Sequence, residues 1–304
     1  MSALRIGSLT RQALHEHLRG PGIFVQMPPF VMHIRSPIAV VADGIHRLYA
    51  QHLCWHQTDR FVDFRVSVRV RRPWWRPLCE FQMDGLQPFT PLAMGEAFAL
   101  LEWGMNWCIT GHCHQWVILH AAVLERGGRA VILPAPPGSG KSTLCAALMG
   151  AGWRLLSDEL TLIDPDSGLI TPSPRPVSLK NASIDVIRRR LPHVPMGPVA
   201  HDTLKGTVCH LKASDDSVAR ADKPARPAWV VFPKYDPQAS LEVQARGKAD
   251  ALLELQRNAF NRHVHGHAGF HAVANVLDAS QAYDLRYSDL DRALAFFDGL
   301  SAHA

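Results

Sequence analysis

Hydrophobic residues follow two spacings along the chain, and these spacings predict where strands and helices lie. From Arg65 to Val70 apolar and polar residues alternate, which is typical of a strand with one face in water. Other short apolar runs are bounded by turn-forming residues and predict further strands. The expected strands are Phe30–Ile34, Phe61–Val70, Leu78–Met83, Trp116–Leu124, Ala130–Leu133, Arg154–Leu156, Leu160–Ile163 and Trp229–Phe232. The expected helices are Ala39–His52, Met94–Ile109, Lys141–Met149, Ala249–Asn258 and Ser288–Leu300.

The order of these elements predicts an α/β protein in two parts. Residues 1–110 form a smaller α+β N-terminal module in this interpretation. Residues 111–304 contain a hairpin that turns at Gly127–Gly128, then a glycine-rich loop, a helix and another strand. Strand, glycine loop, helix, strand is the order that a nucleotide-binding α/β core requires. Loops or sheet edges are expected at the proline-rich stretches Pro172–Pro176, Pro192–Pro198 and Pro224–Pro227.

Composition indicates a globular intracellular protein. Of 304 residues, 47% are hydrophobic and 19% charged, which is enough apolar material for a sizeable core. No apolar run is long enough to span a bilayer, and the N-terminal segment lacks the apolar centre of a signal peptide. Six cysteines are irregularly spaced without a Cys-x-x-Cys pair, which indicates reduced thiols. We therefore expect a cytoplasmic protein that does not cross a membrane.

The positive charge favours a phosphate-bearing ligand. The formal net charge is +5. Arginines are densest in Arg65–Arg76, where they are interleaved with Trp74 and Trp75. The alternation in that segment fits a strand better than the clustered basic patch that nucleic-acid binding needs. A nucleotide is therefore the expected ligand, and nucleic acid is disfavoured.

The strongest chemical signal is the segment AVILPAPPGSGKSTL, from Ala130 to Leu144. From Ala135 it matches the Walker A pattern of a phosphate-binding P-loop, with alanine where the first glycine usually stands. A strand is expected before this loop and a helix after it, so that the positive end of the helix dipole faces the anion. The expected nucleotide-binding residues are Pro137, Gly138, Ser139, Gly140, Lys141, Ser142 and Thr143.

Within this loop, each residue type has a physical reason. Gly138 and Gly140 permit backbone torsions that turn successive N–H groups toward phosphate oxygens. Lys141 supplies a positive charge to the β and γ phosphates of ATP, and the Ser142 hydroxyl can ligate Mg²⁺.

An acidic pair follows the next strand. Asp158 and Glu159 come directly after Arg154–Leu156, and carboxylates at that position can serve as Mg²⁺ ligand and catalytic base. Positive charge could then stabilise the transferring phosphoryl group. The candidate polar and cationic residues for this purpose are Arg175, Lys180, Asn181, Arg220 and Arg226.

These residues resemble a known family. His120, the loop at Gly138–Ser142 and the segment WRLLSDEL from Trp153 to Leu160 are similar to HPr kinase/phosphorylase, a bacterial serine kinase. The segments PAPPGSGKSTLCAAL, PRPVSLKNASIDVI, KGTVCHL and SVARADKPARP resemble the HprK-related kinase A family more closely. That closer likeness extends from about Phe30 to Asp298 and includes EWGMNWC within Phe98–His114.

The resemblance implies a role for several residues. Asp158 corresponds to the general base that accepts the proton of the attacking hydroxyl. Glu159 falls on a second acid, a Mg²⁺ ligand or orienting group, where true HPr kinases usually have aspartate. His120 matches the histidine beside the phosphate site. Lys205-Gly206 stands where HPr kinases have an arginine–glycine pair, although the flanking residues differ and the spacing is longer.

The expected function is that of an ATP-dependent kinase acting on a hydroxyl, as on serine. Family context implies a peptide or small protein as acceptor, and analogy with the hexameric HPr kinases implies a homo-oligomer. The remaining signature of HPr kinases is not recognisable, so the resemblance implies neither HPr as substrate nor a reverse phosphorylase reaction. Two alternatives stay open: a kinase for a sugar or nucleoside, and a protein that changes conformation with ATP without phosphorylating anything.

Overall fold

The computed structural model describes residues 3–72 and 76–302. Trp74 and Trp75, which belong to the basic segment discussed above, lie outside this part of the chain. Among the described residues, none of the helices combines the length and the apolar composition needed to cross a bilayer. The secondary structure mixes helices and strands throughout, so the α/β class is confirmed.

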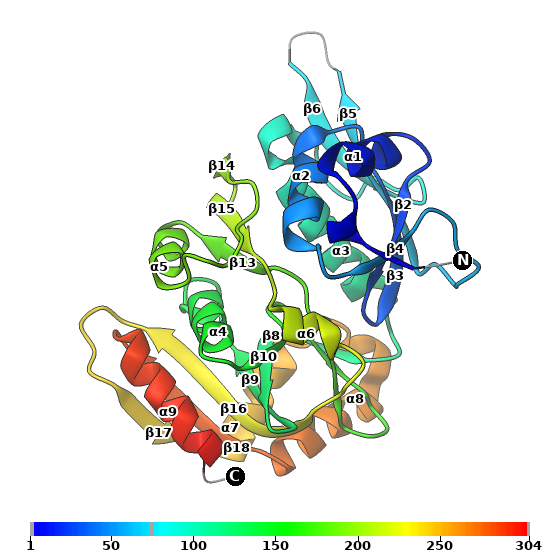
Figure 1. The fold of residues 1–304 in the computed structure, drawn as a ribbon. Helices are drawn as coiled ribbons and strands as arrows, with labels where there is room; N and C mark the ends of the chain where they lie inside the picture. Colours follow the sequence, from blue (N-terminus) through cyan, green and yellow to red (C-terminus); the bar gives the residue numbers. More distant parts are fainter. Residues whose placement is uncertain (1–2, 73–75, 303–304) are drawn as a thin grey trace.

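The first third of the chain forms a mixed seven-stranded sheet with strand order β1-β4-β2-β3-β5-β6-β7 (Figure 1). Its only parallel pair among the described strands is β3 with β5. Three helices pack on this sheet and share its hydrophobic core. The strands are β1 (Leu4–Arg5), β2 (Ile23–Met27), β3 (Phe30–Arg35), β4 (Leu53–Trp55), β5 (Phe64–Arg71), β6 (Leu78–Met83) and β7 (Leu92–Ala93). The helices are α1 (Arg11–Arg19), α2 (Ala39–Leu48) and α3 (Ala97–His112), with short 3₁₀ turns at Ile6–Ser8 and Met94–Glu96.

A second, eight-stranded sheet follows, with order β12-β11-β8-β9-β16-β18-β17 and β10 also paired with β8. Strand β16 runs parallel to both β9 and β18, and the other neighbours are antiparallel. Its strands are β8 (Val117–Arg126), β9 (Arg129–Pro134), β10 (Arg154–Ser157), β11 (Leu160–Ile163), β12 (Ile170–Thr171), β16 (Arg226–Tyr235), β17 (Glu242–Ala245) and β18 (Gln281–Tyr287).

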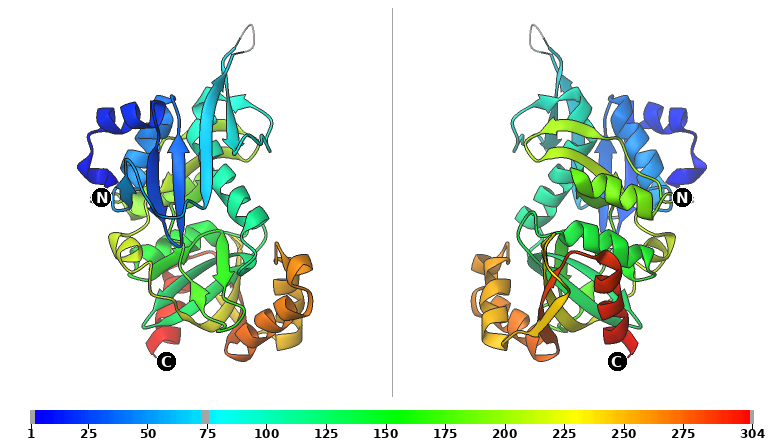
Figure 2. Two further views of the ribbon diagram at one scale, coloured as in Figure 1. Left: turned by 90° about the vertical axis from the view of Figure 1, so that its right-hand side faces the viewer. Right: turned by 90° about the vertical axis from the view of Figure 1, so that its left-hand side faces the viewer.

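Helices cover both faces of this second sheet (Figure 2). Along β9 the side chains alternate between the two faces, as the pleat requires. Val131 and Leu133 join the core under α4 and α9, whereas Ala130 and Ile132 join the core under α7 and α8. The helices are α4 (Lys141–Gly150), α7 (Lys248–Arg257), α8 (Arg262–Asp278) and α9 (Leu290–Ala302).

A small antiparallel sheet, in the order β13-β15-β14, lies between the second sheet and the N-terminal third (Figures 1 and 2). Val177 and Leu179 of β13 and Cys209 and Leu211 of β15 belong to the α4 and α9 core. His210 of β15 packs edge-on against Phe98 of α3. The elements are β13 (Val177–Lys180), α5 (Ala182–Arg190), β14 (Ala200–Thr203), β15 (Gly206–Leu211) and α6 (Asp215–Ala219).

Most long elements expected from the sequence are present, and three features differ from the expectation. The helix expected over Ala39–His52 ends at Leu48. Pro227 was expected in a loop or at a sheet edge, but it lies inside β16, between β9 and β18. The strand tolerates this proline because the register with β9 shifts between Pro227 and Trp229, at an irregularity. Helix α3 crosses the expected boundary between residues 110 and 111, and the N-terminal core includes side chains of β8 and β11.

Candidate functional site

The glycine-rich loop connects β9 to α4 at one end of the second sheet. Gly138 and Gly140 have φ angles of 86° and 84°, in the left-handed region that favours glycine. A Cβ atom at Gly140 would lie 2.8 Å from Cβ of Tyr235 and 2.8 Å from the hydroxyl of Tyr287. The Tyr235 N–H also donates to the Ser139 carbonyl over 2.8 Å. The loop is therefore held against the end of β16, and position 140 has room only for glycine.

The first residues of α4 meet the acidic pair. The Lys141 ammonium group is largely buried and donates to the Asp158 carbonyl oxygen over 2.7 Å. The Ser142 hydroxyl donates to Oδ2 of Asp158 over 3.2 Å, and the Ser178 N–H donates to the same oxygen over 3.0 Å. Two segments distant in sequence, the start of α4 and β13, thus converge on one carboxylate.

The other oxygen of Asp158, Oδ1, is buried and has no hydrogen-bond partner among the described residues. Burial raises the pKa of Asp158, and the charge on Lys141 opposes that effect without reversing it. A carboxylate with a raised pKa and a free oxygen is suited to accepting a proton.

Glu159 has the opposite electrostatic character. Its Oε2 atom accepts a hydrogen bond of 2.7 Å from the Asn106 amide of α3. Burial alone would raise the pKa of Glu159, but the nearby charges of Lys141, Lys180 and Lys205 outweigh burial and lower it. Two adjacent acids therefore differ in protonation tendency, which is how neighbouring carboxylates divide acid–base and charge-stabilising roles.

His120 lies beside this pair, as the sequence predicts. It is on β8 directly opposite Leu160 of β11, the residue after Glu159. Burial, followed by the charge on Lys141, lowers the pKa of His120, so the neutral ring is favoured. Within the described residues, its ring forms no hydrogen bond with Asp158 or Glu159.

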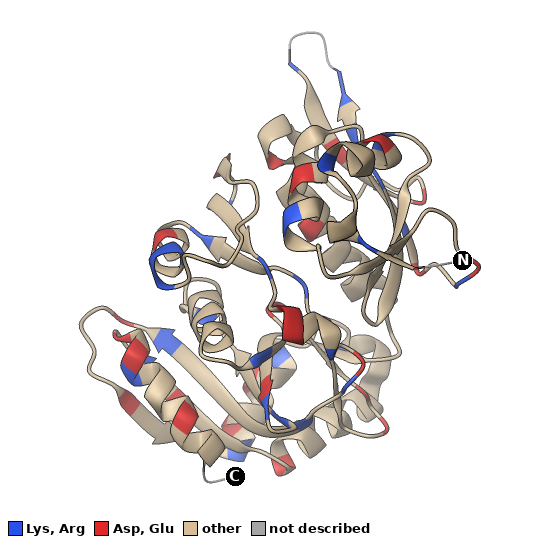
Figure 3. Ribbon diagram, in the orientation of Figure 1, with Lys and Arg blue, Asp and Glu red and all other residues tan. Residues whose placement is uncertain are grey.

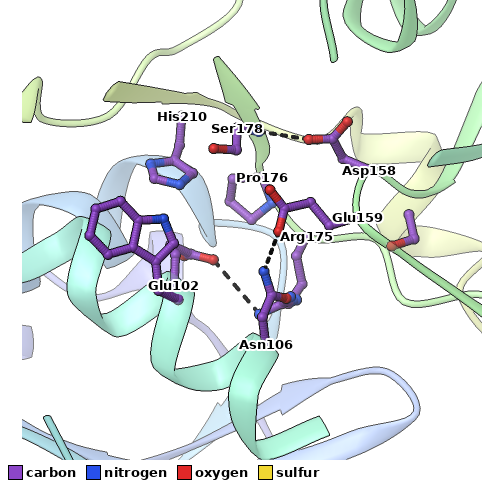
Figure 4. A pocket seen from close by; sticks show the side chains of 10 residues that line it. Glu102, Asn106, Asp158, Glu159, Arg175, Pro176, Ser178 and His210 are labelled. Atoms are coloured by element: carbon purple, nitrogen blue, oxygen red, sulfur yellow. Dashed lines mark hydrogen bonds and ion pairs between the residues drawn. The ribbon is translucent and has the colours of Figure 1, made fainter. Parts of the chain in front are cut away.

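A small cavity of about 20 Å³ adjoins the acids (Figure 4), enough for a single water molecule. Five lining residues have a buried polar atom without a hydrogen-bond partner in the described chain. These atoms are Oδ1 of Asp158, Oγ of Ser178, Oδ1 of Asn106, Nη1 of Arg175 and Nε1 of Trp103. Buried polar atoms are normally satisfied, so this convergence of donors and acceptors indicates a place for a small polar group.

Helix α3 forms one wall of the cavity. Oε1 of Glu102 accepts a hydrogen bond of 2.6 Å from the Tyr49 hydroxyl, and its Oε2 lies 3.8 Å from Nη1 of Arg175. At 3.8 Å the Glu102 and Arg175 side chains form an ion pair, but the two atoms are too far apart for a hydrogen bond. Burial raises the pKa of Glu102 to about 7. The Trp103 ring lies 4.9 Å below the ammonium group of Lys205, which comes from the turn between β14 and β15.

The expected cationic residues fall into two groups. Arg175 lines the cavity, and Lys180 and Lys205 are near enough to Glu159 to lower its pKa. Figure 3 shows basic residues on α4, which begins at Lys141, and on α5, which has arginines in its last turn. Arg220, by contrast, forms ion pairs with Glu125 and Asp216 at 3.2 and 3.0 Å.

Arg226 is also not brought to the site. It begins β16, opposite Arg129 at the start of β9, and both strands then run parallel toward the loop. Arg226 therefore lies at the end of these strands that is opposite the glycine-rich loop.

Sequence reasoning did not identify the α3 residues. Glu102 and Asn106 are four positions apart on a helix whose other side chains are mostly apolar. Polar residues at that spacing lie on the same helix face, and this was the available signal. Ser178 and His210 gave no comparable signal, because isolated polar residues in strands are common.

Comparison with known proteins found no protein-family model and no curated protein that matches this chain.

Proposed function

We propose that this protein is an ATP-dependent kinase of the P-loop class, which transfers the γ-phosphoryl group to a hydroxyl, such as that of serine in a peptide or small protein. The observation that carries the proposal is the position of Asp158. Asp158 is hydrogen-bonded to both Lys141 and Ser142 at the start of α4, and it also lines a one-water cavity. A phosphate cradle and a proton acceptor are thus adjacent, as phosphoryl transfer to a hydroxyl requires.

The loop offers the groups that hold a triphosphate. The N–H groups of the first turn of α4 have no partners within the helix, and backbone torsions at Gly138 and Gly140 curve the loop around the same point. Lys141 has three N–H donors, of which one bonds the Asp158 carbonyl. The other two remain for the β and γ phosphates of ATP.

The residues fit Mg²⁺ as the companion of ATP. Magnesium in such sites usually takes one or two carboxylates in addition to phosphates and waters. Ser142 and Glu159 would hold it, because the hydroxyl is next to Asp158 and the low pKa of Glu159 keeps that carboxylate ionised. When bound, the metal neutralises charge on the phosphates.

The reaction then follows from the cavity. The acceptor hydroxyl occupies it, and its oxygen attacks the γ-phosphorus while the bond to the β-phosphate oxygen breaks and ADP leaves. The Asp158 carboxylate takes the hydroxyl proton. Arg175 and Lys141 stabilise the negative charge that spreads over the transferring group.

The size of the cavity favours an acceptor whose hydroxyl is carried on a narrow side chain. About 20 Å³ holds one oxygen atom, whereas pockets for small molecules are usually of roughly 300–1,000 Å³. A serine side chain reaches such a space more readily than a sugar ring does. This supports a peptide or protein acceptor over a sugar or nucleoside.

The test is transfer of label from γ-labelled ATP in cell lysate, followed by mass spectrometry. Label on a protein or peptide that disappears with Lys141→Ala supports the proposal. Label on metabolites instead would assign the protein to small-molecule kinases. Tight ATP binding that Lys141→Ala abolishes, with no labelled product, would identify a nucleotide-gated binding protein and overturn the proposal.

A further inference from the structure

An exposed aromatic ring lies beside the glycine loop on the side away from the acids. Tyr235 ends β16, its N–H bonds the Ser139 carbonyl, and its Cβ contacts the Gly140 position. Even so, 47% of Tyr235 is exposed to solvent. A large aromatic side chain in contact with the loop is therefore held in place but not covered.

The strand order gives a direction to a bound triphosphate. Strands β8 and β11 lie on one side of β9. Strand β8 carries His120, and β11 begins directly after Asp158 and Glu159. On the other side of β9 lies β16, with Tyr235 at its end (Figure 1). If the γ-phosphate is next to Lys141 and Asp158, the nucleoside extends toward β16.

Tyr287 explains why the Tyr235 ring is well positioned. The two rings pack nearly perpendicular, at 71° and 5.9 Å between centroids. Tyr287 itself is only 1% exposed, and its hydroxyl donates to the Gly140 carbonyl over 3.3 Å. The buried ring thus fixes the exposed one relative to the loop, so little side-chain entropy is lost when a ligand stacks on Tyr235.

We propose that Tyr235 is the stacking platform for the purine base of the nucleotide, which deepens the proposed function and rests on it. Stacking on an aromatic ring is tolerant of base identity, because every base presents a π-face. The adjacent acid, Asp236, accepts two hydrogen bonds from Arg286, at 3.0 and 2.5 Å, and is not free to select guanine. The subsite therefore binds adenine and guanine with similar affinity.

The experiment compares binding of MgATP, MgGTP and inorganic magnesium tripolyphosphate by calorimetry. The full-length variants are Tyr235→Ala and Tyr235→Phe, and Phe61→Ala serves as a control because it removes an aromatic ring that is 82% exposed in the N-terminal third. We expect Tyr235→Ala to weaken both nucleotides roughly 5- to 150-fold and to leave tripolyphosphate binding within about twofold. Tyr235→Phe and Phe61→Ala should bind all three ligands as the wild type does.

Two results would overturn the inference while nucleotide binding itself stands. One is a wild type that binds ATP and a Tyr235→Ala variant that binds it equally well. The other is an equal loss of ATP and tripolyphosphate affinity in Tyr235→Ala, which would mean that the ring supports the loop only. A wild type that binds neither ligand would instead refute the proposed function, and the subsite with it.

Discussion

Replacing Asp158 by asparagine separates proton acceptance from nucleotide binding. The amide oxygen can still accept from the Ser142 hydroxyl and the Ser178 N–H, as Oδ2 does now. Hydrogen bonds to a neutral acceptor are weaker by about 1 kcal/mol each. The loss is offset because burial, which raises the pKa of Asp158, disfavours the carboxylate that is removed. We expect the free energy of unfolding to change by no more than about 1 kcal/mol.

The catalytic effect of Asp158→Asn should be much larger. A general base contributes about 10²- to 10⁴-fold to the rate, and an amide cannot accept the hydroxyl proton. Single-turnover transfer from γ-labelled ATP should slow by that factor, while the Kd for MgATP, measured by calorimetry, should not increase. In the wild type, the transfer rate should rise with pH through the raised pKa of Asp158, because only the ionised carboxylate is a base.

Asp164→Asn is the matched control, since the Asp164 carboxylate only caps a surface turn through Asp166 and Ser167. It should leave transfer unchanged. If Asp158→Asn transfers phosphate within about tenfold of the wild type while Lys141→Ala abolishes transfer, Asp158 is not the base. If ATP affinity falls in parallel with the rate, its role is in binding.

Three further substitutions test the fold around the site. The pKa of Glu102 is raised from 4.5 to about 7, so the folded state holds a proton that the unfolded chain releases. The free energy of unfolding therefore falls as pH rises through 7. In Glu102→Gln this fall should be smaller by about 3 kcal/mol, measured by urea titrations between pH 5 and pH 9. Gly140→Ala should lower both Tm and ATP affinity, whereas Gly85→Ala, with a similar φ of 86° but nothing within 4 Å, should show only the backbone strain of about 1–2 kcal/mol. Arg154→Ala leaves the buried carboxylate of Glu125 without its main partner and should destabilise the fold by about 3 kcal/mol or more, measured by urea denaturation; a change below 1 kcal/mol would contradict this.

Much of the second sheet could be predicted from the sequence because its signals are local. The apolar run before the glycine loop predicts β9, and the pair Gly127–Gly128, with φ angles of 61° and 82°, marks the hairpin turn. Helix α4 begins at Lys141, directly after the positive-φ residue Gly140. Each of these features depends on residues within a few positions, so the sequence is sufficient.

The small sheet of β13, β15 and β14 was not predicted, and neither was α8. Strands β13 and β14 have four residues each, and their apolar positions are too few to establish a period. Helix α8 is interrupted at Gly266, where φ is 53°, and it contains several histidines that obscure the helical pattern. Contacts with α4 and the second sheet stabilise these segments, and such contacts are not visible in local sequence.

Within the candidate site, the sequence by itself determined the loop and the acids that follow it. The chemistry of Gly138–Ser142 and of Asp158 is set by residue type and by position between a strand and a helix. Tertiary structure alone decided which of the acids is easily protonated. Burial and cation distance set the pKa of Asp158 and Glu159 in opposite directions, although the two residues are adjacent in the chain.

Tertiary structure also decided that α3 and Arg175 lie beside the acids and that Tyr235 lies beside the loop. Asn106 bonds Glu159 across 53 positions of sequence, and Tyr235 lies far beyond the loop that it contacts. A chain encodes such neighbours through the packing of whole sheets and helices, which is a property of the folded core and not of any local pattern.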